Sequence, residues 1–81
     1  MDKNLVIVTD KDLAIFLVMC GLDIIDIRKD KGHNRSLIFF HDNEELKKAT
    51  LEYANKSKVV NVADYLAAEK RIKTLLYLQK Q

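Results

Sequence analysis

Proline is absent from this chain of 81 residues, and glycine occurs only twice. Flexible linkers and low-complexity segments are rich in these residues, so their scarcity predicts one domain over residues 1–81. Within it we expect a β-α-β-β-α core over 1–60 and a C-terminal helix over 61–81. Hydrophobic residues make up 48% and charged residues 32% of the chain, a balance typical of globular rather than disordered proteins.

Cysteine is equally scarce, because Cys20 is the only one and an internal disulfide is therefore excluded. The longest uninterrupted apolar run, residues 13–20, is far shorter than the roughly 18 residues that span a bilayer. The N-terminus shows no signal-peptide pattern. These absences predict a cytoplasmic location and no membrane partner.

The first third of the chain predicts a strand followed by a helix. Residues 5–8 are apolar and mostly β-branched, which favours a strand buried on both faces. Thr9 is positioned to cap a helix over 10–20, and Gly21 can supply the left-handed residue after its end. Because this helix is apolar on every side, we expect it to be either enclosed in the core or covered by a second chain.

The middle of the chain predicts a β-hairpin and two further helices. Residues 22–28 and 37–40 read as strands on either side of a polar turn over 29–35. Asp42 opens a capping-box signature for a second helix, and Asn61 can cap a third.

The resulting order, β-α-β-β-α-α, predicts an α+β fold in which helices pack on a three-stranded mixed sheet. A helix separates the first two strands, so we expect them to be parallel neighbours, with the third strand antiparallel.

The last helix carries an apolar stripe at alternating spacings of three and four, typical of a helix-packing seam. Leu66, Tyr77 and Leu78 fall outside this stripe. Together with the all-apolar first helix, they predict a homodimer or another protein partner, although scattered surface hydrophobes are the alternative. The residues expected at such an interface are Tyr65, Ala68, Ile72, Leu75 and Leu76.

Positive charge concentrates around Gly32, although the net charge of the chain is only +2. A basic two-stranded ribbon fits the major groove of DNA, and phosphate contact needs only positive charge and reach. We therefore expect the turn to contact nucleic acid, with a plain solvated turn as the alternative. The predicted contact residues are Arg28, Lys29, Lys31, Asn34 and Arg35, with Lys70 and Lys73 on the last helix.

No arrangement of side chains predicts an enzyme. Cys20 could act as a nucleophile with His33 or His41, but it ends an apolar run and no oxyanion-hole glycine motif accompanies it. These three residues also lack the close paired spacing of zinc sites, so neither a metal nor a cofactor is expected. A metal-dependent nuclease could use Asp23 or Asp26, but a regular strand would point the two to opposite faces.

A series of short motifs runs along the chain: Ile-Val-Thr-Asp-Lys-Asp-Leu-Ala over 7–14, Leu17, Gly21, Ile-Arg-Lys-Asp over 27–30, Arg35 and Phe39. On these motifs the chain resembles a small domain of unknown function of low-GC Gram-positive bacteria and their phages. That family has Phe-x-Phe in its third strand, from which residues 37–41 of this chain depart. The resemblance implies a phage or prophage context and transfers no catalytic residue.

The leading prediction is a small, non-enzymatic, phage-type binding protein that contacts nucleic acid through residues 28–35. The alternative is a protein-binding modulator, such as an inhibitor of a host or defence enzyme, that acts through apolar helix surfaces.

Overall fold

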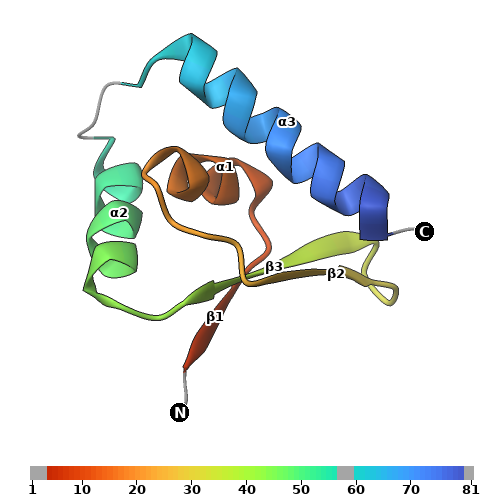
Figure 1. The fold of residues 1–81 in the computed structure, drawn as a ribbon. Helices are drawn as coiled ribbons and strands as arrows, with labels where there is room; N and C mark the ends of the chain where they lie inside the picture. The colour runs from red at the N-terminus through yellow and green to blue at the C-terminus, as the bar shows by residue number, and fades with distance from the viewer. Residues whose placement is uncertain (1–3, 57–59, 80–81) are drawn as a thin grey trace.

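The computed structural model describes residues 4–56 and 60–79. Six elements follow the predicted order (Figure 1). They are β1 (Leu5–Val8), α1 (Lys11–Met19), β2 (Asp26–Asp30), β3 (Arg35–His41), α2 (Glu44–Asn55) and α3 (Val62–Gln79). The α+β class and the β-α-β-β-α-α order are confirmed.

The three strands form one antiparallel sheet in the order β1-β3-β2. The predicted mixed sheet, with β1 and β2 as parallel neighbours, is therefore wrong. β1 and β2 do run in the same direction, because each is antiparallel to β3, but β3 lies between them and pairs with both. The connection through α1 therefore places β2 one strand position away from β1. The hairpin then returns β3 to the position between them.

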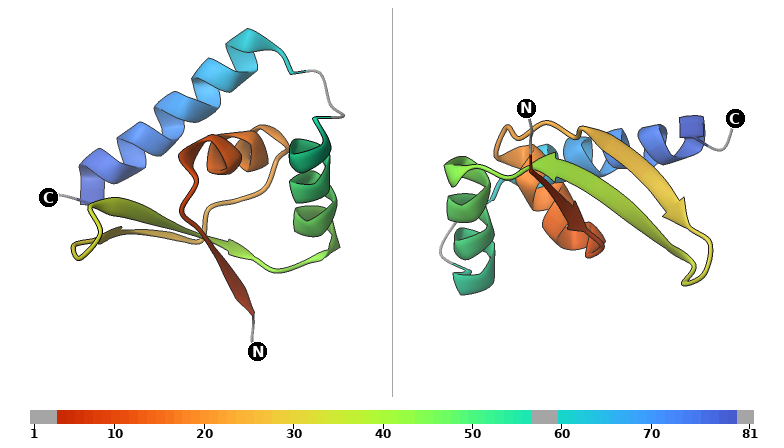
Figure 2. Two further views of the ribbon diagram at one scale, coloured as in Figure 1. Left: turned by 180° about the vertical axis from the view of Figure 1, so that it is seen from behind. Right: turned by 90° about the horizontal axis from the view of Figure 1, so that it is seen from below.

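All three helices lie on one side of the sheet, and the other side is open (Figures 1 and 2). α1 packs against β1, α2 and α3, so its apolar surface is covered by the chain itself. Residues 14–18 of α1 are all buried. The first of the two expectations for this helix, enclosure in the core, is therefore confirmed.

The helix ends show where side-chain capping occurs. Asp10, rather than Thr9, caps α1 by accepting hydrogen bonds from the Asp12 and Leu13 backbone N–H groups. Asn43, rather than Asp42, caps α2 through the Leu46 N–H at 2.8 Å. Thr, Asp and Asn are all favoured at helix N-caps. The sequence pattern alone therefore could not choose between Thr9 and Asp10, or between Asp42 and Asn43.

The other two predicted helix boundaries are confirmed. Asn61 accepts hydrogen bonds from the Ala63 and Asp64 N–H groups at the start of α3. α1 ends in a Schellman motif, in which the Leu22 N–H bonds to the Leu17 carbonyl and Gly21 takes a left-handed φ of 90°.

β2 begins at Asp26, four residues later than the predicted strand start at residue 22. β3 begins at Arg35, earlier than predicted, so the hairpin turn is shorter than expected. The alternation of β2 was hard to read from the sequence, because four of its five residues are charged and only Ile27 is buried.

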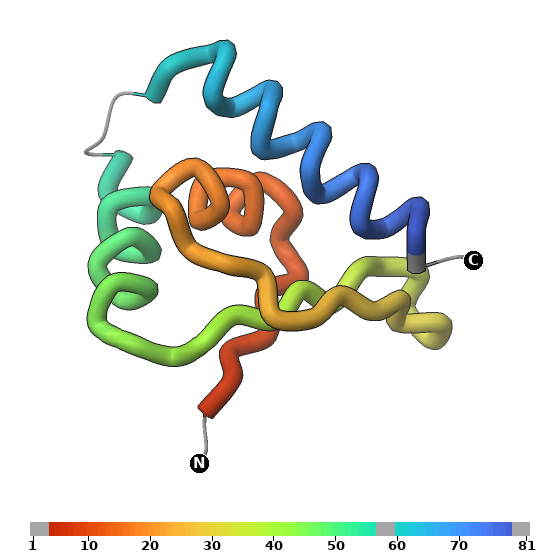
Figure 3. Tube along the Cα trace, in the orientation of Figure 1, coloured from red at the N-terminus to blue at the C-terminus, as the bar shows by residue number. Residues whose placement is uncertain are grey.

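α3 runs across α1 and ends beside the β2–β3 hairpin, as the chain trace in Figure 3 shows. Its apolar stripe packs on the core of this chain. Ala68 and Ile72 are buried, and Tyr65, Leu75 and Leu76 are partly buried against them. Ala68 and Ile72 are therefore not exposed to a partner, because they are buried where α3 packs on the rest of the chain.

β1 is an edge strand, and the expectation that it is buried on both faces is wrong. Val8 points into the core, whereas Leu5 and Ile7 are 46% and 52% exposed on the open side of the sheet. A four-residue apolar strand looks the same in sequence whether one or both of its faces are covered. None of the helices in the described part of the chain is long and apolar enough to cross a membrane.

Candidate nucleic-acid interface

The tip of the β2–β3 hairpin is organised by Asp30, the last residue of β2. Its carboxylate accepts a hydrogen bond from the Gly32 N–H at 3.3 Å, and from the Arg35 Nε at 3.0 Å. The His33 Nδ1 lies 3.0 Å from the same carboxylate, and the His33 N–H bonds to the Asp30 carbonyl. Asn34 completes the turn with a left-handed φ of 50°. The tip is therefore a defined turn rather than a loose loop.

Arg28 lies on the open side of the sheet. Its Nε donates to Asp26 Oδ2 at 2.8 Å, and its guanidinium lies 5.8 Å from the centre of the Phe39 ring. The hydrogen bond from Arg28, followed by one from the Ile27 N–H, lowers the pKa of Asp26 from its ordinary value of 3.8. The arginine side chain is still 67% exposed, so it remains accessible to a ligand.

The predicted contact residues of the hairpin do not all share one face. Alternation along β2 places Arg28 on the open side and Lys29 on the side of the helices, where Ile27 is buried. Arg28 and Arg35 are paired with carboxylates, whereas Lys29 and Lys31 form no ion pair with any described residue. The hairpin therefore presents two arginines that are paired with carboxylates and two lysines that pair with no described residue.

The middle of α3 adds further positive charge, on a helix whose C-terminal end lies beside the hairpin. Lys70, Arg71 and Lys73 are exposed there, and only Lys73 approaches a described carboxylate, Glu69 Oε2 at 3.9 Å. The end of α3 lies next to the hairpin in every view of Figures 1 and 2. We name this set of basic residues on the hairpin and on α3 the cationic pole: Arg28, Lys29, Lys31, Arg35, Lys70, Arg71 and Lys73.

The family model "Domain of unknown function (DUF5659)" matches residues 3–78. The chain belongs to this family. No curated protein and no solved structure matches it. Membership confirms that the resemblance seen in the sequence is to a domain of unknown function, while the bacterial and phage range of the family stays a prediction.

The other chemically active side chains of this DUF5659 domain are dispersed. Cys20 is half-buried at the end of α1, and His41 is exposed at the end of β3. Asp23 lies in the loop before β2, and Asp26 is engaged by Arg28. Among the described residues no three His, Cys, Asp or Glu side chains gather closely enough to hold a metal ion.

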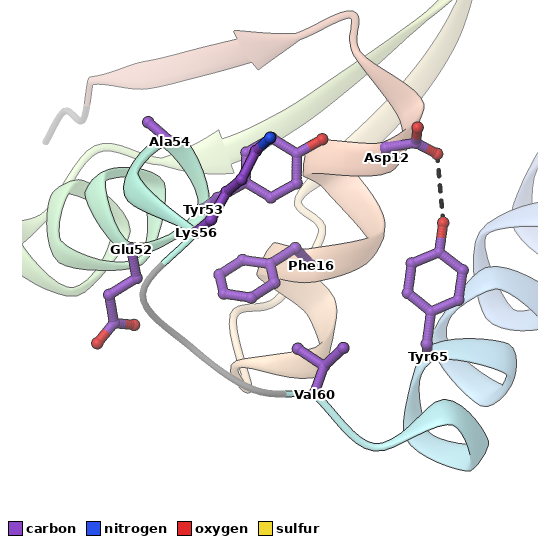
Figure 4. A pocket seen from close by; sticks show the side chains of 8 residues that line it. All are labelled: Asp12, Phe16, Glu52, Tyr53, Ala54, Lys56, Val60 and Tyr65. Carbon is purple, nitrogen blue, oxygen red and sulfur yellow. Dashed lines mark hydrogen bonds between the residues drawn. The ribbon is translucent and has the colours of Figure 1, made fainter.

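A pocket of about 490 Å³ opens between the three helices (Figure 4). The Phe16 and Tyr53 rings lie 5.5 Å apart at its base, and the Tyr65 hydroxyl donates to Asp12 at one side of it. Burial, and then the charge of Asp12, raise the pKa of Tyr65. The residues that line the pocket are Asp12, Phe16, Glu52, Tyr53, Ala54, Lys56, Val60 and Tyr65.

The organising role of Asp30 was missed in the sequence, where it counted only as a charge that opposes the basic residues. The signal was present, because an Asp two residues before a Gly is typical of a side-chain-to-backbone turn. Phe39 was also missed as a neighbour of Arg28. That contact depends on the register between β2 and β3, which local sequence does not determine.

Proposed function

We propose that this chain is a small non-enzymatic binding protein whose cationic pole contacts the phosphates of a nucleic acid. The observation that carries the proposal is the separation of charge. Residues 28–35 and 70–79 hold seven basic side chains and one acidic one, whereas the rest of the chain holds seven basic and eleven acidic. A polyanion would therefore meet one attractive end on an otherwise acidic molecule.

The ion pairs of the hairpin do not oppose this proposal. Exposed salt bridges contribute about 0–1 kcal/mol, so a phosphate can replace a carboxylate at small cost. Arg28 and Arg35 use Nε for their carboxylates, and a guanidinium has further N–H donors that can reach a phosphate. The turn that Asp30 holds keeps these donors in place.

The test compares two triple variants with equal loss of charge. Lys29, Lys31 and Lys70 are replaced by Ala in the pole variant, and Lys11, Lys47 and Lys48 in the control variant. Fluorescence anisotropy with labelled DNA and RNA should show binding by the wild type that weakens steeply with salt. The pole variant should bind at least about tenfold more weakly with a shallower salt dependence, because fewer counterions are released.

The control variant should bind nearly as the wild type does. Equal losses in the two variants would mean that net charge alone causes binding, and would reject the cationic pole as a site. Absence of wild-type binding to DNA and RNA at low salt would reject the proposed function. The proposal includes a cytoplasmic location and a phage or prophage context, in which nucleic acid is accessible.

A second candidate function is a protein-binding modulator, which the pocket between the helices favours. Its aromatic base and the exposed Val60 at its border could accept an apolar side chain of a partner. Val60→Lys should abolish capture of such a partner, whereas Leu51→Lys, at an exposed apolar position outside the pocket, should not. Loss of capture in both variants, or in neither, would reject the pocket as the docking site.

A further inference from the structure

β1 leaves one of its two edges unpaired in the described part of the chain, because the sheet order places it outside β3. An unpaired strand edge offers a row of N–H and C=O groups to another strand. Proteins commonly protect such edges with charged side chains, proline or a bulge. β1 consists of Leu-Val-Ile-Val, and its register with β3 is continuous, so it has none of these protections.

The direction of the backbone groups in β1 follows from its pairing with β3. The Asp42 N–H donates to the Asn4 carbonyl at 3.1 Å, which makes residues 4 and 42 a hydrogen-bonded pair. Because such pairs alternate along an antiparallel ladder, Val6 also bonds toward β3. The backbone groups of Leu5 and Ile7 therefore point away from the sheet, at the free edge.

We propose that β1 pairs antiparallel with β1 of a second copy of this chain, which joins the two sheets into one of six strands. The register that uses both outward-facing residues places Leu5 opposite Ile7 of the other copy, and Val6 opposite Val6 on a two-fold axis. Each Leu5–Ile7 pair then exchanges two backbone hydrogen bonds.

In this arrangement the side chains of β1 in one copy are complementary to those of β1 in the other. On the open side of the sheet, Leu5 and Ile7 meet their counterparts and lose exposure. No charged side chain lies within β1, so the two copies bring no like charges together there. A two-fold interface requires this kind of self-complementary surface.

The position of the cationic pole also favours a second copy at β1. β2 forms the opposite edge of the sheet, with β3 between it and β1. The two cationic poles of the dimer would therefore lie at its far ends, where their mutual repulsion is weakest. Pairing through β2 would instead bring the poles together.

Disulfide crosslinking tests the register. In a Cys20→Ala background, Val6→Cys places two cysteines at a non-hydrogen-bonded pair, where Cα atoms are about 4.5 Å apart and a disulfide can form. Ile7→Cys is the matched control, because its two copies would be offset by two residues on each strand and about 8 Å apart or more. Mild oxidation should therefore crosslink the Val6→Cys protein to a dimer and leave the Ile7→Cys protein largely uncrosslinked.

Light scattering after size exclusion tests the interface itself. The wild type should be a dimer, and Ile7→Lys should raise its dissociation constant at least tenfold, while Leu51→Lys on the exposed surface of α2 should leave it unchanged. A wild type that stays monomeric at high concentration, or equal crosslinking of both cysteine variants, would overturn the proposal. The crosslinking result decides the matter if Ile7→Lys does not fold.

Discussion

The two outer strands of the sheet pair with the same central strand, β3, yet they carry opposite side chains. β1 is entirely apolar, whereas β2 reads Asp-Ile-Arg-Lys-Asp and exposes charges along its whole length. Charges at an edge strand oppose the approach of another strand. The β2 edge is therefore protected from sheet extension, and the β1 edge is not.

The contrast indicates a division of roles between the two edges. Arg28 and Lys29, two of the four charges that protect β2, also belong to the cationic pole, so these two side chains can serve both purposes. The apolar side chains of β1 offer nothing to a phosphate, but they match a second copy of themselves.

The largest effect is expected from a change in β3, on which both edges depend. Phe40 is 1% exposed on the core side of this strand, and Phe40→Ala should cost about 3–5 kcal/mol of unfolding free energy. The stability of a small domain is of similar size, so much of the protein should unfold, and both edges should be lost together. Urea denaturation followed by circular dichroism measures this.

Phe39→Ala is the matched control for that substitution. Phe39 is the adjacent residue of β3, but it lies on the open side and is only partly buried beside Arg28. Its loss should cost clearly less than the loss of Phe40. Equal destabilisation by both substitutions would contradict a sheet that is covered on one side only.

An intermediate effect is expected when the two basic charges of β2 are removed. Replacing Arg28 and Lys29 by Val should create a second unprotected edge, and a protein with two such edges can associate without closing. Light scattering should then show species larger than those of the wild type. Lys70→Val with Lys73→Val removes the same charge from a helix surface and should not have this effect. Similar growth of both double variants would attribute association to lost charge rather than to the strand edge.

Much of this fold could be predicted from local sequence, because most of its elements are short and clearly bounded. Gly21 and Asn61 mark helix ends by their own backbone and hydrogen-bonding properties, and the structure confirms both. The order of the strands could not be predicted in this way. Whether β3 pairs with β2 alone or with both β2 and β1 depends on contacts between residues that are far apart in the sequence.

The candidate site, like the fold, could be predicted from the sequence only in part. Its basic residues were identified from charge density, which needs no structure. Their pairing partners were not identified, because the Arg28–Asp26 contact and the Arg35–Asp30 contact depend on how the hairpin orients each side chain. The edge position of β1 was also missed. Leu5 and Ile7 are exposed because no helix covers their side of the sheet, and local sequence does not show which side the helices cover.

The smallest effect concerns Asp26, where the charge pattern of the β2 edge can be titrated. The Arg28 hydrogen bond lowers the pKa of Asp26 below 3.8, so the folded state holds the ionised carboxylate more favourably than the unfolded state does. This contribution to stability is complete above pH 3.8 and is lost as pH falls through the folded-state pKa. Asp26→Asn should therefore be slightly less stable than the wild type near pH 7, and the difference should shrink in acid. Because the pair is exposed, raised salt should also shrink the difference at pH 7.

Urea denaturation at several pH values measures the difference in stability between wild type and Asp26→Asn, with Asp23→Asn as a control whose carboxylate pairs with no described cation. A difference between wild type and Asp26→Asn that grows as the pH falls would show that the Arg28–Asp26 pair does not stabilise the β2 edge.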